Sequence, residues 1–185
     1  MRFVATTWEQ LRARYALVGS FASGIWGEPR FAPDIDVVVE IDSRHVDLLC
    51  AAFPPDNFDV NRAAAAEAVA LLRPFHVIHP KSGNKIDFIV QGAAAWQRGQ
   101  IERSVRVPLS EDGSIQVASP ADVIIGKLAY CHERGSDKHP RDIAGILRVN
   151  GAMVDCSLVD AAAEELAEEL EVADVWRRLR HAARS

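Results

Sequence analysis

Two aspartates, Asp34 and Asp36, are separated by one apolar residue and begin an apolar run that ends at Val39. Residues on a strand alternate between its faces, so both carboxylates are expected on one face, about 7 Å apart, while Ile35 and Val37 point into the core. Two carboxylates placed in this way repel each other unless a cation lies near them. Mg²⁺ binds one or two carboxylates together with substrate phosphates, so the pattern predicts a Mg²⁺ site, with Mn²⁺ as the alternative ion.

A second group of residues precedes this strand and is suited to phosphate. The apolar segment 15–18 ends at Gly19 and Ser20, and a short helix is expected to follow. Gly19 would let a phosphate approach the backbone, and Ser20 lies where the first turn of the helix presents free N–H groups. A strand, a phosphate-binding turn, a helix and a strand with two carboxylates together indicate a site for a metal-bound nucleotide.

Asp87 is the candidate for a third carboxylate. Residues 85–90 follow a turn and are typical of a buried strand, whose alternation leaves Lys85 and Asp87 on the face opposite the core. Lys85 is expected either to bind a phosphate or to offset the charge of three acids. The alternative for Asp87 is an acid at the edge of a strand that only pairs with Lys85.

Seven residues stand at the spacing of the first motif of the DNA polymerase β-like nucleotidyltransferase superfamily, which they resemble. They are Gly19, Ser20, Ala22, Gly27, Arg30, Asp34 and Asp36. One position departs from the motif, because Ala32 stands where Thr is common. The resemblance implies an α/β fold, a polymerase β-like palm with a mixed sheet, flanking helices and a C-terminal helical segment. It also implies that Asp34, Asp36 and Asp87 are the catalytic residues and the metal ligands.

Two later segments resemble a branch of that superfamily that includes abortive-infection toxin-type nucleotidyltransferases and uncharacterised stand-alone domains. Residues 119–128 are similar to its helix with a Ser-Pro start and a Lys-Leu end, and residues 138–146 to its Arg-Asp helix start. Gly145 stands where that branch usually carries a second Asp. The resemblance implies a set of nucleotide-binding residues, namely Gly19, Ser20, Arg30, Lys85 and Lys127.

Two of these cations and one aromatic residue have structural alternatives. Arg30 is expected either to neutralise phosphate charge or to pair with Glu28 or Asp34. Lys127 lies on a core-facing helix, where it would reach the triphosphate or extend its stem along apolar surface to water. Trp26 precedes Gly27, where a packed aromatic is favoured over one that covers a base.

The composition is that of a globular chain, with 185 residues of which 49% are hydrophobic and 25% charged. We expect a nucleotidyltransferase core over residues 1–118 and a helical subdomain over 119–185. The net charge of −5 argues against nonspecific binding to nucleic acid, and leaves a local basic patch open. One such cluster, Arg177, Arg178 and Arg180, is expected on a solvated helix, with a contact to RNA or protein as the alternative.

The cellular setting is expected to be the cytoplasm. Cys50, Cys131 and Cys156 are odd in number and lack Cys-x-x-Cys spacing, which is typical of reduced thiols. No signal peptide is expected, and no apolar run approaches the ~18 residues of a membrane span. We therefore expect no membrane partner.

The function expected from these residues is Mg²⁺-dependent transfer of a nucleoside monophosphate from an NTP to a hydroxyl, with release of pyrophosphate. The acceptor is open between RNA, protein and a small molecule, and a toxin–antitoxin or defence setting fits the resemblance. A protein partner or a second copy of the chain is a further expected partner. The alternative is a nucleotide-binding module or an inactive domain that acts through a protein partner. Ala32 and Gly145 argue for this alternative, and the intact set of three acids argues against it.

Overall fold

The computed structural model describes residues 13–92, 95–110, 113–131, 137–167 and 172–183. The contacts between residues divide the chain into two units. The sheet unit comprises the described residues up to Leu17 together with Ala32–Val117. The helical unit comprises Val18–Phe31 and the described residues from Ala118 onward. The boundary expected after residue 118 stays a prediction, and the contacts add that residues 18–31 group with the C-terminal helices.

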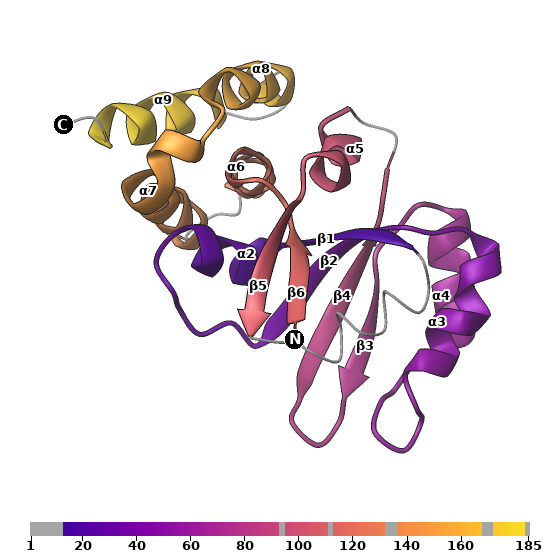
Figure 1. Ribbon diagram of the computed structural model, residues 1–185. Helices are drawn as coiled ribbons and strands as arrows, with labels where there is room; N and C mark the ends of the chain where they lie inside the picture. Colours follow the sequence, from indigo (N-terminus) through magenta and orange to yellow (C-terminus); the bar gives the residue numbers. More distant parts are fainter. Residues whose placement is uncertain (1–12, 93–94, 111–112, 132–136, 168–171, 184–185) are drawn as a thin grey trace. The chain divides into compact units, whose positions relative to one another are not determined.

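A mixed sheet forms the sheet unit (Figure 1). Among the described residues it has six strands in the order β3-β4-β2-β1-β6-β5. The strands are β1 (Arg14–Val18), β2 (Asp34–Glu40), β3 (Phe75–His79), β4 (Asn84–Val90), β5 (Val105–Ser110) and β6 (Gly113–Val117). β2 runs parallel to β4 and β1 parallel to β6, whereas the pairs β3–β4 and β5–β6 are antiparallel. The predicted α/β class with a mixed sheet is confirmed.

Helices that follow β2 pack on one face of this sheet. After β2 come η1 (Ser43–His45), α3 (Val46–Ala52) and α4 (Arg62–Ala70), and Figure 1 shows α3 and α4 beside β3 and β4; α5 (Ala95–Glu102) follows β4. Phe88 is fully buried on the covered face, where its ring stacks on Phe75 at 5.1 Å and meets Phe53 edge-on at 5.9 Å. Burying one such ring stabilises the fold by about 1.5–3 kcal/mol. This packing fixes which face each strand turns to the core.

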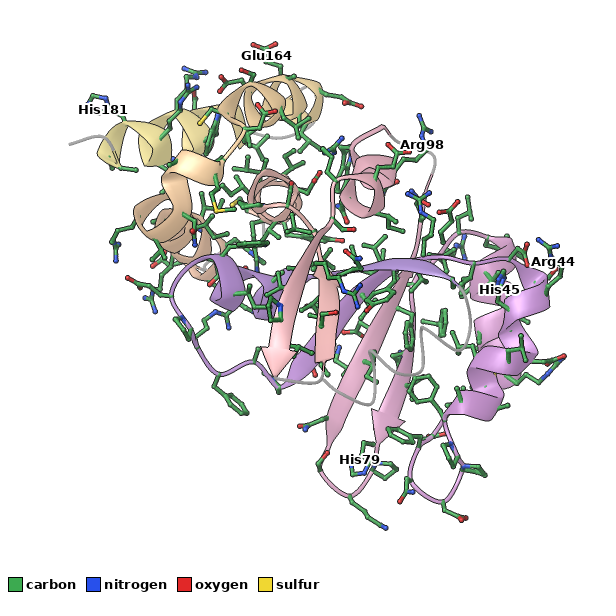
Figure 2. All side chains as sticks on the ribbon, viewed as in Figure 1. Arg44, His45, His79, Arg98, Glu164 and His181 are labelled. Atoms are coloured by element: carbon green, nitrogen blue, oxygen red, sulfur yellow. The ribbon has the colours of Figure 1, made fainter. Side chains whose placement is uncertain are left out.

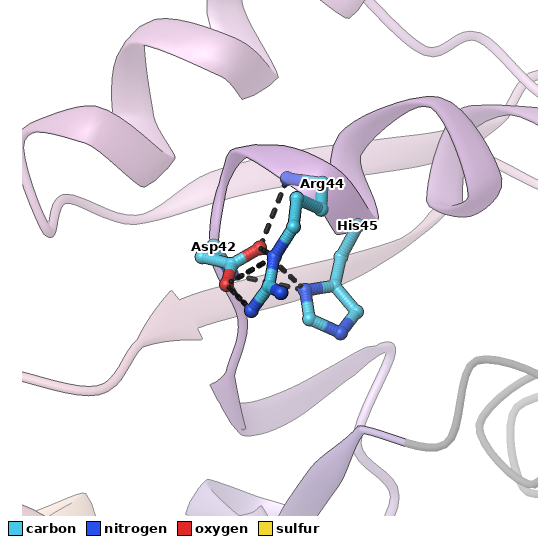
Figure 3. A network of polar contacts seen from close by, with 3 residues as sticks. All are labelled: Asp42, Arg44 and His45. Carbon is cyan, nitrogen blue, oxygen red and sulfur yellow. Dashed lines mark hydrogen bonds and ion pairs between the residues drawn. The ribbon is translucent and has the colours of Figure 1, made fainter.

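A local capping arrangement begins η1 directly after β2 (Figure 3). The backbone N–H of Arg44 donates to Asp42 Oδ1 at 2.9 Å, and the backbone N–H of Asp42 donates to His45 Nδ1 at 3.2 Å. The Arg44 guanidinium also lies 2.6 Å from Asp42, and its hydrogen bonds hold the pKa of that carboxyl well below its usual range. These contacts join residues two and three apart and satisfy the free N–H groups of the helix start. They therefore explain local structure and point to no ligand.

The helical unit contains the short helix that follows β1 and the C-terminal helices. They are α2 (Gly19–Trp26), α6 (Pro120–Ala129), α7 (Lys138–Asn150), η2 (Gly151–Met153), α8 (Cys156–Ala167) and α9 (Val172–Ala182). The predicted start of α6 is confirmed, because the backbone N–H of Asp122 donates to Ser119 Oγ at 3.2 Å and Pro120 occupies the first turn. Ile124 and Ile125 are fully buried, which makes α6 a central helix of this unit.

Asp160 joins α8 to α9. Trp176 Nε1 donates to its Oδ1 at 2.6 Å, and Arg180 Nη1 lies 2.7 Å from its Oδ2. Arg177 pairs with Asp174 within α9. Two of the three arginines in the predicted basic cluster are thus ion-paired inside the helical unit. Within the described ranges, no helix is both long and apolar enough to cross a membrane.

Candidate functional site

The three predicted carboxylates lie on one face of the sheet. β2 and β4 are parallel neighbours, and their register pairs Asp36 with Asp87 and Asp34 with Lys85. Asp34 and Asp36 share a face because they are two residues apart on one strand, and paired residues on neighbouring strands share a face as well. All three aspartates are half-buried. The register therefore brings together Asp34, Asp36, Asp87 and Lys85, which we call the carboxylate row.

Lys85 supplies a cation to the carboxylate row. Its Nζ lies 2.7 Å from Asp87 Oδ2 and 3.7 Å from Asp34 Oδ2. The hydrogen bond to Asp87 raises the pKa of Lys85, and the negative charges of Asp34 and Asp36 act in the same direction. The pairing of Lys85 with Asp87, which the sequence left open, is present. Asp87 does not lie at the edge of the sheet, since β4 stands between β3 and β2.

The donors of the carboxylate row match a hard divalent ion in chemistry, because carboxylate oxygens are the protein ligands that Mg²⁺ prefers. In this structure, however, the carboxylate oxygens are not oriented around an ion site. In the part of the chain that the structure describes, no three His, Cys, Asp or Glu side chains are grouped to hold a metal ion. Asp34 and Asp87 lie instead within 4 Å of the Lys85 ammonium. A bound ion would require the oxygen atoms that now contact Lys85 to turn toward it.

A second set of polar groups is buried within the helical unit. Asp142, in the first turns of α7, accepts from Arg30 Nε at 2.8 Å and from Arg30 Nη2 at 2.9 Å. Lys127 Nζ lies 2.7 Å from Asp142 Oδ2, and both side chains are only 5% exposed. Arg30 Nη2 also donates to Ser20 Oγ at 2.7 Å. We call Ser20, Arg30, Lys127 and Asp142 the cation cluster.

The charges of the cation cluster do not cancel. Burial lowers the pKa of Lys127 and outweighs its hydrogen bond to Asp142. Burial also raises the pKa of Asp142, but the hydrogen bonds from Arg30 and Lys127 outweigh it and leave the pKa of that carboxyl below its usual value. With all three groups ionised, two cations face one carboxylate, and one positive charge remains. An anion is the group that would balance it.

The first turn of α2 contains Ser20, a member of the cation cluster. Gly19 has a φ of 63°, a left-handed conformation that glycine adopts without strain. No side chain caps the helix, so the N–H groups of its first turn are not satisfied by a capping residue. Such N–H groups suit a phosphate oxygen. Arg30 occupies one lone pair of the Ser20 hydroxyl, whose own hydrogen is left to donate elsewhere.

The structure decides between the alternatives that the sequence left open for three residues. The carboxylate partner of Arg30 is Asp142, whereas Glu28 pairs with Arg148. Lys127 is 4% exposed, so the interpretation as a surface lysine is wrong. Trp26 is 7% exposed and donates from Nε1 to the carbonyl oxygen of Ala118 at 2.7 Å, which confirms a packed aromatic.

Gly27 allows α7 to pack closely on the segment that follows α2. A Cβ at Gly27 would lie 2.8 Å from the backbone nitrogen of Ile146 and 2.9 Å from the carbonyl carbon of Gly145. A Cβ at Gly145 would lie 3.4 Å from the backbone nitrogen of Glu28. The position where the resembling branch carries a second Asp therefore lies at the contact of α7 with this segment, where a Cβ would stand at ordinary van der Waals distance.

Asp142 is the candidate site residue that the sequence prediction did not include. The signal for it was the resemblance of Arg141-Asp142 to the helix start of the branch named above. That resemblance did not reveal the contact with Arg30, because 112 residues separate Asp142 from Arg30. Within the described residues, the cysteine and histidine side chains join no metal-binding group. Burial raises the pKa of the Cys131 thiol to about 11, so this cysteine is protonated near neutral pH. Figure 2 shows His45, His79 and His181 on separate elements, and His79 Nδ1 lies 2.8 Å from Ser82 Oγ beside the β3–β4 turn.

Comparison with known proteins identifies the fold. No model of a known protein family matches the chain, and no curated protein sequence matches it. An antigenic nucleotidyltransferase-like protein from Paracoccidioides brasiliensis aligns with 94% of this chain and 88% of its own, with a TM-score of 0.52 and 21% identity. JHP933 from Helicobacter pylori aligns with 100% and 87%, with a TM-score of 0.51 and 12% identity.

A candidate nucleotidyltransferase from H. pylori is also similar. It aligns with 100% of this chain and 90% of its own, with a TM-score of 0.52 and 13% identity. Identities this low show the fold and do not by themselves show an activity. The chain has the fold of nucleotidyltransferase-like proteins, as the resemblance in its sequence implied.

Proposed function

We propose that the chain transfers a nucleoside monophosphate from a nucleoside triphosphate to a hydroxyl acceptor and releases pyrophosphate. The observation that carries the proposal is the register of β2 and β4, which sets Asp36 beside Asp87 and Asp34 beside Lys85 on one face. The nucleotidyltransferase-like fold supports the proposal. The reaction joins the acceptor oxygen to the α-phosphorus, breaks the bond to the β-phosphate oxygen and releases the acceptor proton.

The carboxylate row would hold a divalent ion, Mg²⁺ or Mn²⁺, through Asp34, Asp36 and Asp87. When bound, such an ion stabilises the charge on the attacking and leaving oxygens of the displacement. Lys85 has three N–H donors and no acceptor, so its natural partner among substrate groups is a phosphate oxygen. Its present pairing with Asp87 keeps that ammonium at the row.

The cation cluster and the start of α2 would bind the phosphate tail. Arg30 and Lys127 bring the excess positive charge, and Ser20 and the N–H groups after Gly19 bring further donors. Catalysis of this kind comes mainly from positioning the reactants and from fixed charges. The residues of the cation cluster thus suit a phosphate tail.

The experiment is a transfer assay without a presumed acceptor. The protein is incubated with each NTP labelled at the α-phosphate, Mg²⁺ or Mn²⁺, and cell extract, beside an Asp34→Ala/Asp36→Ala variant whose fold is checked by circular dichroism. Label on an RNA, protein or small-molecule fraction that is absent with the variant would support the proposal and name the acceptor class. Absence of both label and metal-dependent nucleotide binding would contradict the site.

A nucleotide-binding module that acts through a protein partner is the second candidate function. One observation favours it, namely that Lys85 already neutralises part of the carboxylate row and the described residues present no ready metal group. Nucleotide binding without transfer of label, in the same assay, would favour this function over the enzyme.

A further inference from the structure

Asp142 contacts two of the proposed phosphate-binding cations and contacts no substrate group in the proposed function. We infer that Asp142 is a positioning residue, which holds Lys127 and Arg30 so that the cation cluster is assembled before a nucleotide arrives. The inference rests on the proposed function, in which that cluster binds the phosphate tail. It adds that recognition of the phosphate tail depends on Asp142, although this carboxylate is negatively charged, as the tail is.

The contacts of Asp142 join three segments that are distant in sequence. Arg30 lies between α2 and β2, Lys127 lies on α6, and Asp142 lies on α7. Both carboxylate oxygens are used, since Oδ1 accepts from Arg30 Nε at 2.8 Å and Oδ2 lies 2.9 Å from Arg30 Nη2 and 2.7 Å from Lys127 Nζ. With the side chains of Asp142 and Lys127 5% exposed, water is largely excluded as a substitute partner.

The hydrogen bonds of Arg30 show how Asp142 orients the Arg30 guanidinium. Two parallel N–H···O bonds to one carboxylate fix the plane of a guanidinium, which a single contact would not. With Nε and one hydrogen of Nη2 directed at Asp142, the same Nη2 reaches Ser20 Oγ at 2.7 Å. Asp142 thereby sets the direction of the Arg30–Ser20 contact through Arg30.

A second ion pair on α7 provides a matched control. Arg148 pairs with Glu28, so it joins the same helix to the same loop as the pair of Asp142 and Arg30. Its side chain is 66% exposed and that of Glu28 is 56% exposed. Over the residues that the structure describes, no hydrogen bond or ion pair joins Arg148 to Ser20 or Lys127. An exposed pair of this kind contributes little, and Arg148→Gln should leave the cation cluster as it is.

The test measures how much the phosphate tail adds to nucleotide affinity. Calorimetry with Mg²⁺ gives the dissociation constants of wild type, Asp142→Asn and Arg148→Gln for ATP, GTP, CTP and UTP and for the matching monophosphates. For the tightest base, we expect Asp142→Asn to lose about tenfold or more of the preference for triphosphate over monophosphate, as for one charge-assisted hydrogen bond. Its affinity for the monophosphate should stay within about threefold, and Arg148→Gln should keep the wild-type preference.

If Asp142 had only a structural role, the expected affinities would differ. General loosening of the fold would weaken triphosphate and monophosphate alike and leave their ratio unchanged. A ratio in Asp142→Asn within twofold of wild type, measured below the unfolding temperature of the variant, would overturn the inference. A wild type that binds both nucleotides equally would instead contradict the proposed function at its phosphate site, and this inference with it.

A double variant keeps the test valid if Asp142→Asn does not fold, because that change leaves buried cations unpaired. Lys127→Met removes one of these cations, so Asp142→Asn/Lys127→Met is compared with Lys127→Met alone. If Asp142 positions Arg30, the double variant should show the lower preference for the triphosphate. Equal preferences in the two variants would overturn the inference.

Discussion

Asp36 and Asp87 are register partners on neighbouring parallel strands, so two carboxylates lie side by side on one face of the sheet. Neighbouring strands are about 4.8 Å apart, a distance at which like charges repel strongly unless a cation is near. Lys85 is that cation in this structure, with its Nζ 2.7 Å from Asp87. The carboxylates and the lysine should therefore respond to substitution in different ways.

Asp87→Asn is expected to lower the rate of nucleotidyl transfer about 100-fold or more, since it removes one charged ligand of the proposed ion. The Mg²⁺ concentration that gives half of the maximal rate should rise. Both quantities come from a transfer assay over a Mg²⁺ series. Glu40→Gln is the control, because Glu40 is an exposed acid on β2 that pairs with Arg14. Equal rates for Asp87→Asn and wild type would contradict the prediction.

Lys85→Met is expected to tighten the binding of a divalent ion in the absence of nucleotide. Two unit charges about 4 Å apart repel by about 1–4 kcal/mol between the screening limits of water and a protein surface. The double charge of Mn²⁺ raises this to about 2–8 kcal/mol, or about thirtyfold and upward in affinity. Electron paramagnetic resonance of free Mn²⁺ measures this affinity without any need for activity. Weaker Mn²⁺ binding by Lys85→Met would show that Lys85 does not compete with the ion.

The carboxylate row was predictable because its geometry is local. Alternation along β2 fixes the common face of Asp34 and Asp36, and the apolar residues around Asp87 fix its direction. The sequence could not show which group each charged side chain contacts. Lys85 stands two residues from Asp87, but the sequence left open whether it meets that carboxylate or a phosphate.

The cation cluster was predictable only in part, because its contacts are long-range. Arg30 and Lys127 were candidates through their resemblance to a motif, yet their shared partner Asp142 is 112 residues from Arg30. The spacing of residues along the sequence does not predict which acidic side chain lies next to a given cation in the folded protein. Gly145 likewise lies against Glu28, a residue distant in sequence, and its spacing in the motif does not reveal that contact.

Gly27→Ala is expected to destabilise the protein by about 1–3 kcal/mol, the usual cost of overpacking. The added Cβ would stand 2.8 Å from the backbone nitrogen of Ile146, so a helix must shift rather than a side chain. Gly126→Ala is the matched control, since nothing lies within 4 Å of a Cβ there. That change in mid-helix should stabilise by about 0.5–1 kcal/mol. Urea unfolding compares the two, and equal effects would refute the close contact at Gly27.

Asp142→Ala is expected to destabilise the protein by about 3–5 kcal/mol, because it leaves the buried Lys127 and the Arg30 guanidinium without their carboxylate. Arg148→Ala should change the free energy of unfolding by less than about 1 kcal/mol, as is usual for an exposed pair. Asp142→Ala/Lys127→Met should recover part of the loss. If the single Asp142 variant were as stable as wild type, the buried ion pairs could not have the role assigned to them.

The stability of the protein should depend on Asp142 at acid pH. The pKa of Asp142 is lowered in the folded state, against about 3.9 in an unfolded chain. As pH falls, the unfolded state therefore takes up the proton first, and the free energy of unfolding falls. This contribution is fully present above about pH 5 and is lost through pH 3.9 toward the folded pKa, by at most about 1.4 kcal/mol per pH unit. Urea unfolding between pH 5 and 3.5 should give a steeper decline for wild type than for Asp142→Asn, whereas parallel declines would mean that Asp142 is not held ionised by Arg30 and Lys127.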